Sequence, residues 1–283
     1  MAEFIFSAFA DEIDASFEVQ LQSLNKLGIP YIELRGVNGK SFTTLTDSEV
    51  EDVANLLDKY NIKVWALGSP LGKAVTDCCA KNQTALIRRV MDIGERLDTR
   101  RIRMFSFYPE EGDSFENFEH KAFNLIESLL NEAEKRSFIL CHENEKGIYG
   151  CSQARVKKML DFFGGRLKAV LDLGNFPFCG EEAKGAYALL KDYVEYLHIK
   201  DCDSDGIIVP PGYGSAYIEE TLREINSDRQ GDVIITMEPH LINFTGLSSL
   251  SKLDDIKHKF SFDSPYEAFA FATDKVRRMI ERL

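Results

Sequence analysis

Four short segments of the sequence each carry an ionisable side chain that can serve as a metal ligand. They are CHENE around Glu143, LDLGN around Asp172, LHIKD around His198 and MEPH around Glu238. Three carboxylates buried together would repel one another and lose their hydration, and a divalent cation offsets both costs. A ligand set of oxygens with one imidazole favours manganese or magnesium, with cobalt or zinc as further options. We therefore predict that Glu143, Asp172, His198 and Glu238 bind one divalent metal ion.

Each of these residues also has a structural interpretation when it is taken alone. Polar residues often end buried strands, and a single Glu, Asp or His there is more often structural than a ligand. The prediction of a metal site depends on the recurrence of such a residue in four successive segments of the same kind.

Eight short apolar runs, separated by longer amphipathic stretches, must position these residues. Each run is too short for a helix and rich in Val, Ile, Phe or Tyr, which is typical of buried strands. The runs are 4–9, 31–34, 63–68, 101–107, 137–143, 167–172, 194–200 and 232–238. The amphipathic stretches predict helices at about 16–28, 46–60, 77–97, 115–136, 152–163, 181–191, 215–226 and 265–282. Alternating strands and helices in this number predict an α/β fold, a single (β/α)₈ TIM barrel.

The whole chain, residues 1–283, is expected to form one domain. No stretch rich in Pro, Gly and Ser divides it, and barrels of this type run to about 250 residues as one unit. The irregular stretch at about 240–264 is long for a compact domain, so we expect a lid or an interface loop there.

Side-chain alternation along the strands indicates whether the four candidate ligands face the same way. Function in such a barrel gathers at the carboxyl ends of the strands. When Asp172, His198 and Glu238 point inward, their apolar neighbours fall on the side of the helices. The fifth run fits less well, because an inward Glu143 places His142 outward, where we expect it to be packed and hydrogen bonded.

Four further residues are candidates for substrate binding, each with a structural alternative. Glu33 ends the second run and can hold a substrate hydroxyl or form an ion pair with an Arg or Lys. Trp65 can form an apolar wall beside a substrate, or belong to the core. Lys200 can bind substrate oxygens, pair with a ligand carboxylate or form a rim salt bridge. His240 can contact substrate, orient Glu238 or cap the following loop.

Charge and composition exclude several classes of partner. The formal net charge of −12 disfavours binding to phosphate backbones. No apolar run reaches membrane-spanning length, no secretory signal opens the chain, and the six cysteines include no C-x-x-C pair. We expect a cytoplasmic protein without a nucleic-acid or membrane partner, and leave self-association into a homo-oligomer open.

At the residues named above, the sequence resembles the sugar isomerase/epimerase superfamily, whose members are xylose-isomerase-like TIM barrels. The matching pieces are HENE, VLDLGN, YLHIKD and ITMEPH, together with FADEI near the start and YIELRG around Glu33. The resemblance covers essentially the whole chain and implies the same barrel and the same Glu, Asp, His, Glu metal set. It does not name a substrate, because the superfamily includes ketose epimerases, sugar and hydroxypyruvate isomerases, inosose dehydratases and DNA-repair endonucleases.

The sequence departs from relatives in that superfamily at three points. Many epimerase-like members carry a His three residues after the Asp, where this chain has Asn175, which can bond a substrate hydroxyl but cannot shuttle a proton. Some members place an Arg in the loop after the seventh strand; that loop has none here, so the contact is missing or supplied by Lys200. The endonuclease branch needs extra His ligands for three zinc ions, and the five His of this chain are too few.

The favoured hypothesis is a metal-dependent isomerase or epimerase that acts on a small sugar by removing a proton next to a carbonyl group. In it, Glu143 and Glu238 transfer the proton while the metal stabilises the charge. A lyase that resembles keto-inositol dehydratases begins with the same proton abstraction and then expels hydroxide. A non-catalytic sugar-binding barrel is the third hypothesis.

Overall fold

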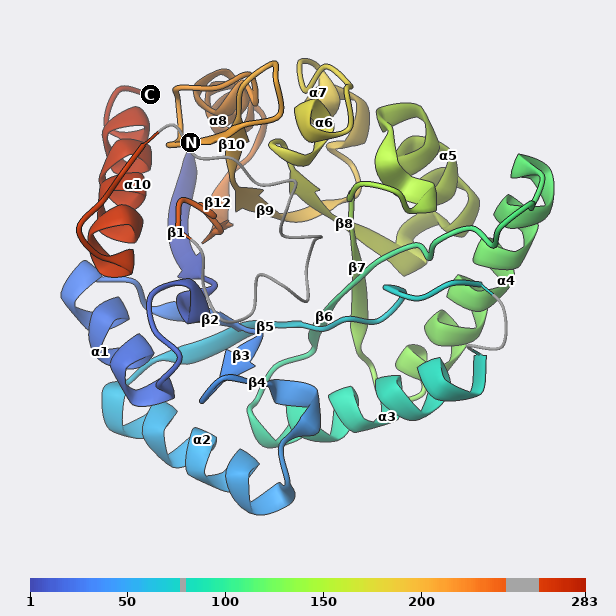
Figure 1. Ribbon diagram of the computed structural model, residues 1–283, viewed down its shortest axis with the longest axis horizontal. Coiled ribbons are helices and arrows are strands. Elements are labelled where there is room, and N and C mark those ends of the chain that lie inside the picture. Colours follow the sequence, from blue (N-terminus) through green and yellow to red (C-terminus); the bar gives the residue numbers. More distant parts are fainter. Residues whose placement is uncertain (77–79, 243–259) are drawn as a thin grey trace.

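Parallel strands joined by helices account for most of the computed structural model, which describes residues 1–76, 80–242 and 260–283. Within those residues, eight strands form one sheet in the order β1-β12-β9-β8-β7-β6-β5-β2. The end strands β1 and β2 also contact each other, so the sheet curls into a nearly closed barrel (Figure 1). The strands are β1 (Ala2–Ala8), β2 (Tyr31–Leu34), β5 (Lys63–Gly68), β6 (Arg101–Met104), β7 (Ile139–Glu143), β8 (Leu167–Asp172), β9 (Val194–Ile199) and β12 (Gly231–Met237). The predicted TIM barrel is confirmed.

Helices surround this barrel on its outside (Figure 1). The sequence marks several of their ends: Thr46 forms a capping box with Glu49, and Gly28 ends the first helix in a left-handed conformation. The helices are α1 (Phe17–Leu27), α2 (Asp47–Tyr60), α3 (Ala80–Arg96), α4 (Phe115–Glu134), α5 (Gln153–Phe163), α6 (Asn175–Phe178), α7 (Ala186–Leu190), α8 (Ile218–Asp228) and α10 (Pro265–Ile280).

Two segments differ from the secondary structure expected from the sequence, and a third lies mostly outside the described residues. The helix expected at 181–191 is only α7, because Gly185 at φ 77° precedes it. The fourth strand ends at Met104, since Phe105 and Phe107 donate their N–H groups to the carbonyls of Leu71 and Gly72 instead of continuing the sheet. Most of the loop expected at 240–264 lies outside the described residues, so its role as a lid or interface remains a prediction. Short antiparallel pairs, β3 (Gly36–Val37) with β4 (Lys40–Ser41) and β10 (Asp201–Cys202) with β11 (Ile208–Val209), extend two of the other loops.

Apolar side chains form one cluster inside the barrel and another between the sheet and the helices. Cys141, Val170 and Tyr196 belong to the inner cluster, and each is two residues before a predicted metal ligand. Leu171, Leu197, Ile199 and Met237 belong to the outer cluster, as the predicted alternation requires. Residues two apart on a strand share a face, so the inner cluster ends just below the candidate site.

His142 lies between the barrel wall and the surrounding elements, as its expected outward direction requires. It is fully buried, and its Nε2 lies 2.9 Å from Ser106 Oγ, which also accepts a hydrogen bond from the Gly150 N–H. Burial lowers the pKa of His142 to about 3 from an ordinary 6.5. The folded protein therefore keeps this imidazole neutral in weak acid, whereas the unfolded chain takes up a proton.

The free energy of unfolding is expected to fall below about pH 6.5 because of His142. Its pKa is depressed in the folded state, so the stability it contributes is present above pH 6.5 and is lost as the pH falls toward 3. His142→Gln can still bond Ser106 but cannot titrate. Between pH 7 and pH 4 the metal-free wild type should lose about 3 kcal/mol more than this variant in urea unfolding. Parallel pH profiles for the two proteins would contradict a neutral, buried His142.

Candidate metal centre

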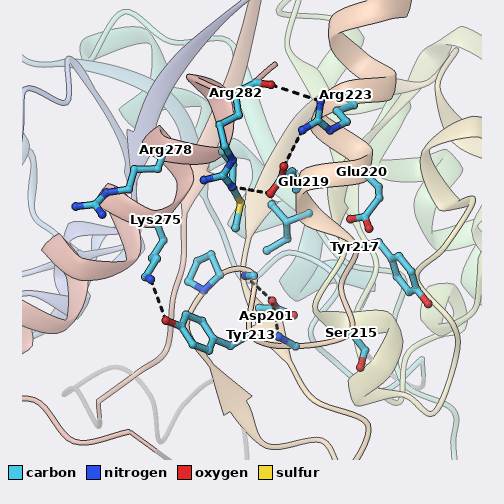
Figure 2. Close-up of a pocket in the computed structure, with 15 residues that line it drawn as sticks. Asp201, Tyr213, Ser215, Tyr217, Glu219, Glu220, Arg223, Lys275, Arg278 and Arg282 are labelled. Atoms are coloured by element: carbon cyan, nitrogen blue, oxygen red, sulfur yellow. Dashed lines mark hydrogen bonds and ion pairs between the residues drawn. The ribbon is translucent and has the colours of Figure 1, made fainter.

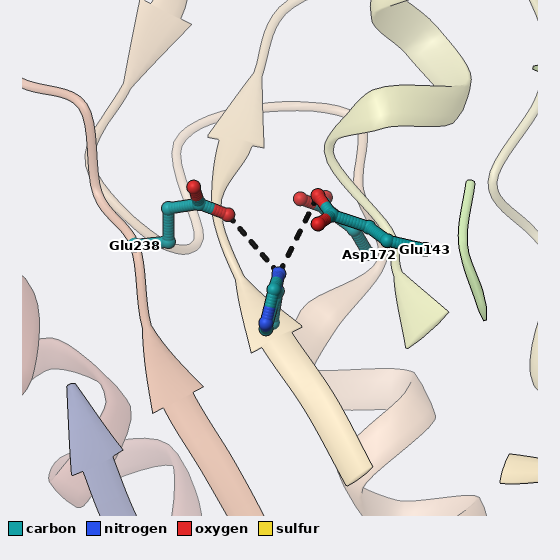
Figure 3. A group of neighbouring side chains, drawn as sticks. Glu143, Asp172 and Glu238 are labelled. Atoms are coloured by element: carbon teal, nitrogen blue, oxygen red, sulfur yellow. Dashed lines mark ion pairs between the residues drawn. The ribbon is translucent and has the colours of Figure 1, made fainter. Parts of the chain in front are cut away.

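The side chains of Glu143, Asp172, His198 and Glu238 converge at the carboxyl ends of β7, β8, β9 and β12. One ligand atom from each lies within 4.8 Å of the others, and all four residues are buried. His198 Nδ1 is 3.1 Å from Glu238 Oε2 and 3.5 Å from Glu143 Oε1. Figure 3 shows the three carboxylates directed toward one small volume. The strand register helps to bring the ligands together, because Asp172 on β8 is paired with His198 on β9.

The polar atoms of this cluster are suited to a divalent cation. Within the described residues, Asp172 Oδ2, His198 Nδ1 and Glu238 Oε2 are buried, and their near polar neighbours are one another and Lys200. His198 Nδ1 lies 3.1 Å from Glu238 Oε2, and Lys200 Nζ lies 2.8 Å from Asp172 Oδ2. Carboxylate oxygens and an imidazole nitrogen gathered this closely are a donor set that a divalent cation binds. Burial raises the pKa of Asp172 to about 7, which reflects the cost of holding these acids together. Donor chemistry, burial and spacing therefore fit one divalent ion.

Glu33 orients His198 from the side opposite the cluster. His198 Nε2 lies 2.9 Å from Glu33 Oε2, and Tyr196 donates its hydroxyl to Glu33 Oε1 at 2.9 Å. A carboxylate bonded to one imidazole nitrogen fixes the ring and directs the other nitrogen toward a metal. Both Glu33 oxygens are thus engaged by protein groups, which favours a positioning role, and a contact with a substrate hydroxyl stays a prediction.

Glu33→Gln is expected to weaken metal binding by about 10- to 100-fold, because it removes the charge that orients His198. Metal titration followed by calorimetry measures this directly. The control is Tyr196→Phe, which removes only the hydrogen bond to the other Glu33 oxygen and should change the affinity less than threefold. Equal affinity in wild type and Glu33→Gln would show that the contact does not support the metal centre.

Asn175 and Asn144 bracket the carboxylates of the cluster. Asn175 donates from Nδ2 to the Asn144 carbonyl at 2.8 Å and to Glu143 Oε1 at 3.3 Å. Its backbone N–H donates to Asp172 Oδ1 at 3.0 Å. Asn144 forms two hydrogen bonds with the backbone of Asp172, at 2.7 and 3.0 Å. The donors of Asn175 therefore hold Glu143 and Asp172 in place, which the expectation of a substrate contact did not include.

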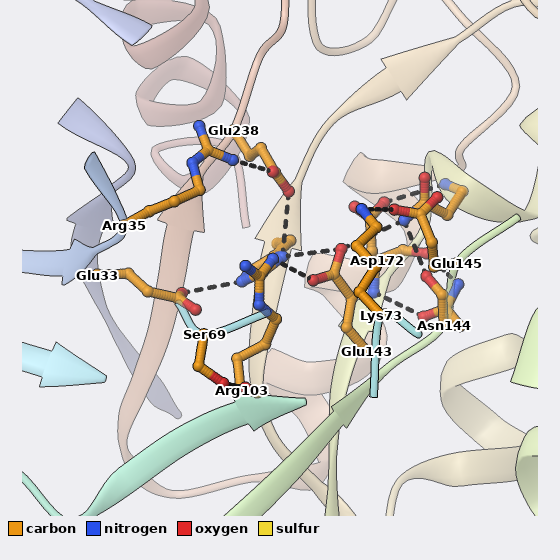
Figure 4. A network of polar contacts seen from close by, with 12 residues as sticks. Glu33, Arg35, Ser69, Lys73, Arg103, Glu143, Asn144, Glu145, Asp172 and Glu238 are labelled. Atoms are coloured by element: carbon orange, nitrogen blue, oxygen red, sulfur yellow. Dashed lines mark hydrogen bonds and ion pairs between the residues drawn. The ribbon is translucent and has the colours of Figure 1, made fainter. Parts of the chain in front are cut away.

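Two buried arginines contact the cluster, and the sequence reasoning missed both. Arg35 Nη1 lies 2.8 Å from Glu238 Oε1, and Arg103 Nη1 lies 2.8 Å from Glu143 Oε2 (Figure 4). Arg35 follows Glu33 by two residues, and Arg103 lies in the run RIRM. Side-chain alternation directs both toward the inside of the barrel, and this pattern could have identified them from the sequence. Glu143 and Glu238 each direct one oxygen toward the cluster and the other toward a guanidinium.

Lys200 is the third cation of the centre. Its Nζ lies 2.8 Å from Asp172 Oδ2 and 3.8 Å from Glu238 Oε2. Burial alone would lower the pKa of Lys200, but Asp172 and Glu238 outweigh burial and raise that pKa well above its ordinary value. Lys200 therefore pairs with the predicted ligand carboxylates, one of the alternatives that the sequence left open.

His240 and Glu12 form a second group around Glu238. His240 donates its backbone N–H to Glu12 Oε2 at 2.9 Å, and its Nε2 is 3.7 Å from both Glu12 Oε1 and Glu238 Oε1. Burial raises the pKa of Glu12 to about 8 despite the nearby Arg35, and it lowers that of His240 well below the ordinary range. His240 thus lies beside Glu238, where it can orient that carboxylate. Glu12, within FADEI, was not among the predicted site residues.

Trp65 is not brought to this centre. It stands early in β5, and its ring packs edge-on against Tyr31 and Tyr196 while Arg101 lies 3.9 Å above it. It also lines a pocket with Lys63 and Arg101, which are the first residues of β5 and β6. These contacts favour the alternative of a core residue, and the contact of Trp65 with substrate stays a prediction. A register shift in the pairing of β2 and β5 makes Ala66 the partner of Glu33, and Trp65 lies one residue earlier in the strand, packed against the inner cluster.

The segment PPGYGS at 210–215 holds a carboxylate of the protein itself. The backbone N–H groups of Gly212, Gly214 and Ala216 donate to Asp201 at 2.8, 3.0 and 3.1 Å. This segment also borders a cavity of about 840 Å³ between the β10–β11 region, α8 and α10 (Figure 2). Charged residues around that cavity pair with one another, as Glu219 does with Arg223 and Arg282. The predicted ligands do not border it.

No described helix is long and apolar enough to cross a membrane. The expected absence of a membrane partner is not tested further by this finding.

Solved structures of low sequence identity share the fold over nearly the full length. D-allulose 3-epimerase from Methylomonas sp. in complex with D-allulose is 15% identical, with a TM-score of 0.75 and coverage of 99% of this chain and 98% of that one. The probable 3-DHS dehydratase from Bacillus anthracis is 13% identical, with a TM-score of 0.73 and coverage of 98% and 99%. A xylose isomerase-like TIM barrel protein from Mycobacterium smegmatis in complex with magnesium is 13% identical, with a TM-score of 0.68 and coverage of 98% and 97%.

The sequence itself also identifies a family. No curated protein matches it significantly. The family model described as "Xylose isomerase-like TIM barrel" matches residues 21–258, which is most of the chain. With the barrel and the resemblance at the strand ends, this match settles the assignment: the chain belongs to the xylose isomerase-like TIM barrel family.

Proposed function

We propose that this protein is a divalent-metal-dependent enzyme that isomerises or epimerises a small sugar by removing a proton next to a carbonyl group. The observation that carries the proposal is the convergence of Glu143, Asp172, His198 and Glu238, whose ligand atoms lie within 4.8 Å of one another in a buried cluster. Manganese or magnesium suits the oxygen-rich set, with cobalt or zinc as alternatives. The similar folds of a D-allulose 3-epimerase and of a magnesium-bound barrel support this direction.

In this proposal, two glutamates of the chain transfer the proton and two arginines hold those glutamates in place. A divalent ion held here would polarise a substrate carbonyl and acidify the adjacent C–H bond. Glu143 and Glu238 approach the cluster from different strands and are the groups placed to accept and return the proton. Arg103 and Arg35 each hold one oxygen of these carboxylates, which fixes their direction and makes them weak bases. An acidified C–H bond is therefore needed for such bases to act.

A lyase is the second candidate, and Lys200 is the observation that favours it. Asp172 and Glu238 hold Lys200 as an ammonium ion, and its Nζ lies at the edge of the cluster. A positioned ammonium can protonate a hydroxyl group as it leaves, which an epimerase does not require. The similarity in fold to a probable dehydratase supports the same possibility. The two candidates share the first step and differ in their product.

The test is a screen of ketoses and keto-inositols in deuterated water, with and without added manganese or magnesium. We expect deuterium at the carbon next to the carbonyl only when metal is present, and expect a chelator to abolish it. A product of unchanged composition identifies an isomerase or epimerase, and a product that has lost water identifies a lyase. Exchange that persists after chelation would contradict metal dependence. Binding of sugars without exchange would favour the non-catalytic barrel.

A further inference from the structure

A pocket of about 450 Å³ opens beside the metal centre, at the ends of β2, β5 and β6. Two of its lining residues, Arg35 and Arg103, are the arginines that hold Glu238 and Glu143. Lys40 and Lys73 also line it, and Asp11 is the one acid among its described lining residues. Arg35 is engaged by Asp11, Glu12 and Glu238, and Lys40 pairs with Glu49 at 2.6 Å, so Arg103 and Lys73 are the cations to consider for an incoming anion.

The fold places two of these cations, Lys73 and Arg103, against one aromatic ring. Lys73 Nζ and Arg103 Cζ each lie 4.6 Å from the centroid of the Phe105 ring. Gly72, at φ 75°, makes this possible, because a Cβ there would lie 1.9 Å from the carbonyl oxygen of Phe105. The loop after β5 therefore lies against Phe105, just after β6, and Figure 4 shows Lys73 beside Glu145.

The pocket offers more hydrogen-bond donors than its internal partners engage. The Arg103 side chain is only 3% exposed, its Nη1 bonds Glu143, and its Nε is a buried donor without a partner among the described residues. A guanidinium carries five N–H donors in a fork that suits carboxylate and phosphate. Lys73, 10% exposed, pairs with Glu145 at 3.2 Å, which is longer than the 2.8 Å ion pairs of the metal centre. An incoming anion can therefore bond Arg103 and share Lys73 with Glu145.

We propose that this pocket binds an acidic group of the substrate, a carboxylate or a phosphate, so that the substrate is an acidic sugar derivative and not a neutral sugar. The proposal rests on the proposed function, because it places the rest of the substrate at the metal centre. Charge sharing with a divalent ion would also draw Glu143 and Glu238 away from Arg103 and Arg35. Anion binding and metal binding should consequently strengthen each other by the same factor.

The test compares three ketoses that share a carbon skeleton and differ at one end: D-fructose, D-fructuronate and D-fructose 6-phosphate. Their dissociation constants are measured by calorimetry at fixed ionic strength, with and without manganese. We expect at least one acidic ketose to bind at least about tenfold more tightly than D-fructose, as charge-assisted hydrogen bonds require. The tighter of the two identifies carboxylate or phosphate as the anchored group.

Lys73→Met tests the pocket without touching a predicted metal ligand or its arginine. It should weaken binding of the acidic ketose at least about tenfold and leave D-fructose unchanged, and Lys73→Arg should restore most of the affinity. The matched control is Lys59→Met, which removes a lysine that pairs with Glu18 at 2.7 Å on the outside of the barrel. It should change neither constant more than twofold. Thermal unfolding confirms that each variant is folded.

The outcomes separate this proposal from the proposed function. The acidic substrate class is overturned if neither acidic ketose binds below about 10 mM, if D-fructose binds as tightly, or if Lys73→Met leaves the affinity unchanged. Metal titration without any sugar tests the centre independently. Anion binding that depends on Lys73 in a protein that takes up no metal would uphold the pocket and overturn the metal-dependent chemistry.

Discussion

Replacing His198 by alanine is expected to remove most of the metal from the purified protein. His198 presents Nδ1 to the cluster at 3.1 and 3.5 Å from two carboxylates, and Glu33 fixes its ring from behind. Burial alone would lower the pKa of His198, but Glu33 and Glu143 raise it well above its ordinary value. A metal ion must therefore displace a proton from the imidazole, and its binding should tighten as the pH rises. Asp172→Ala removes an oxygen ligand and should have a similar effect.

Elemental analysis of the two variants and of the wild type provides the measurement. The wild type should contain about one equivalent of a divalent ion, and each variant should retain only a small fraction of it. His120→Ala is the control, because His120 is exposed on α4 and far in sequence from the strand ends. Full retention of metal in both His198→Ala and Asp172→Ala would overturn the ligand assignment.

Glu143→Gln and Glu238→Gln are each expected to lower turnover at least about a hundredfold, the usual scale for the loss of a general base. The amide keeps the shape and one ligating oxygen, so part of the metal should remain bound. It also brings an NH₂ group against either the cluster or the arginine, Arg103 for Glu143 and Arg35 for Glu238. Both orientations cost a favourable contact, and neither leaves a carboxylate to accept a proton.

The rate of hydrogen exchange between substrate and deuterated water measures both variants, and metal analysis shows whether the centre is still loaded. Glu195→Gln is the matched control, because Glu195 pairs with Arg101 near the amino end of β9 and should leave exchange unchanged. Near-normal exchange in one of the two site variants would rule out a mechanism with two carboxylates. A single base, with Lys200 or His240 as the other proton carrier, would then be the better hypothesis.

The barrel and the gathering of the four candidate ligands were predictable because both follow from local sequence patterns. These are the alternation of strands with helices and the two-residue alternation of side chains within a strand. A strand of alternating parity places Val170 and Asp172 on one face and Leu171 on the other. Parallel strands in a barrel bring their carboxyl ends together whatever the loops contain. Alternation also places Arg35 and Arg103 on the inner face, because Leu34, Ile32, Ile102 and Met104 belong to the outer cluster.

The roles of individual side chains could not be obtained in this way, since they depend on contacts between residues distant in sequence. Glu33 lies 2.9 Å from His198, a residue 165 positions away in the sequence, and no local pattern indicates that contact. Trp65 lies beside a register shift in the pairing of β2 and β5, where Ala66 is the partner of Glu33. Simple alternation cannot place a side chain next to such an irregularity.

The three backbone hydrogen bonds that Asp201 accepts affect how this barrel can acquire new specificity. Lys200 faces the metal centre, and the next residue closes the following loop by accepting the N–H groups of Gly212, Gly214 and Ala216. The backbone on both sides of residues 203–211 is thereby tied to one carboxylate, independently of what lies between. Segments of other lengths and sequences can therefore be grafted between these two anchor points while the ammonium group of Lys200 keeps its position. The loop after β9 can in this sense be exchanged without moving Lys200.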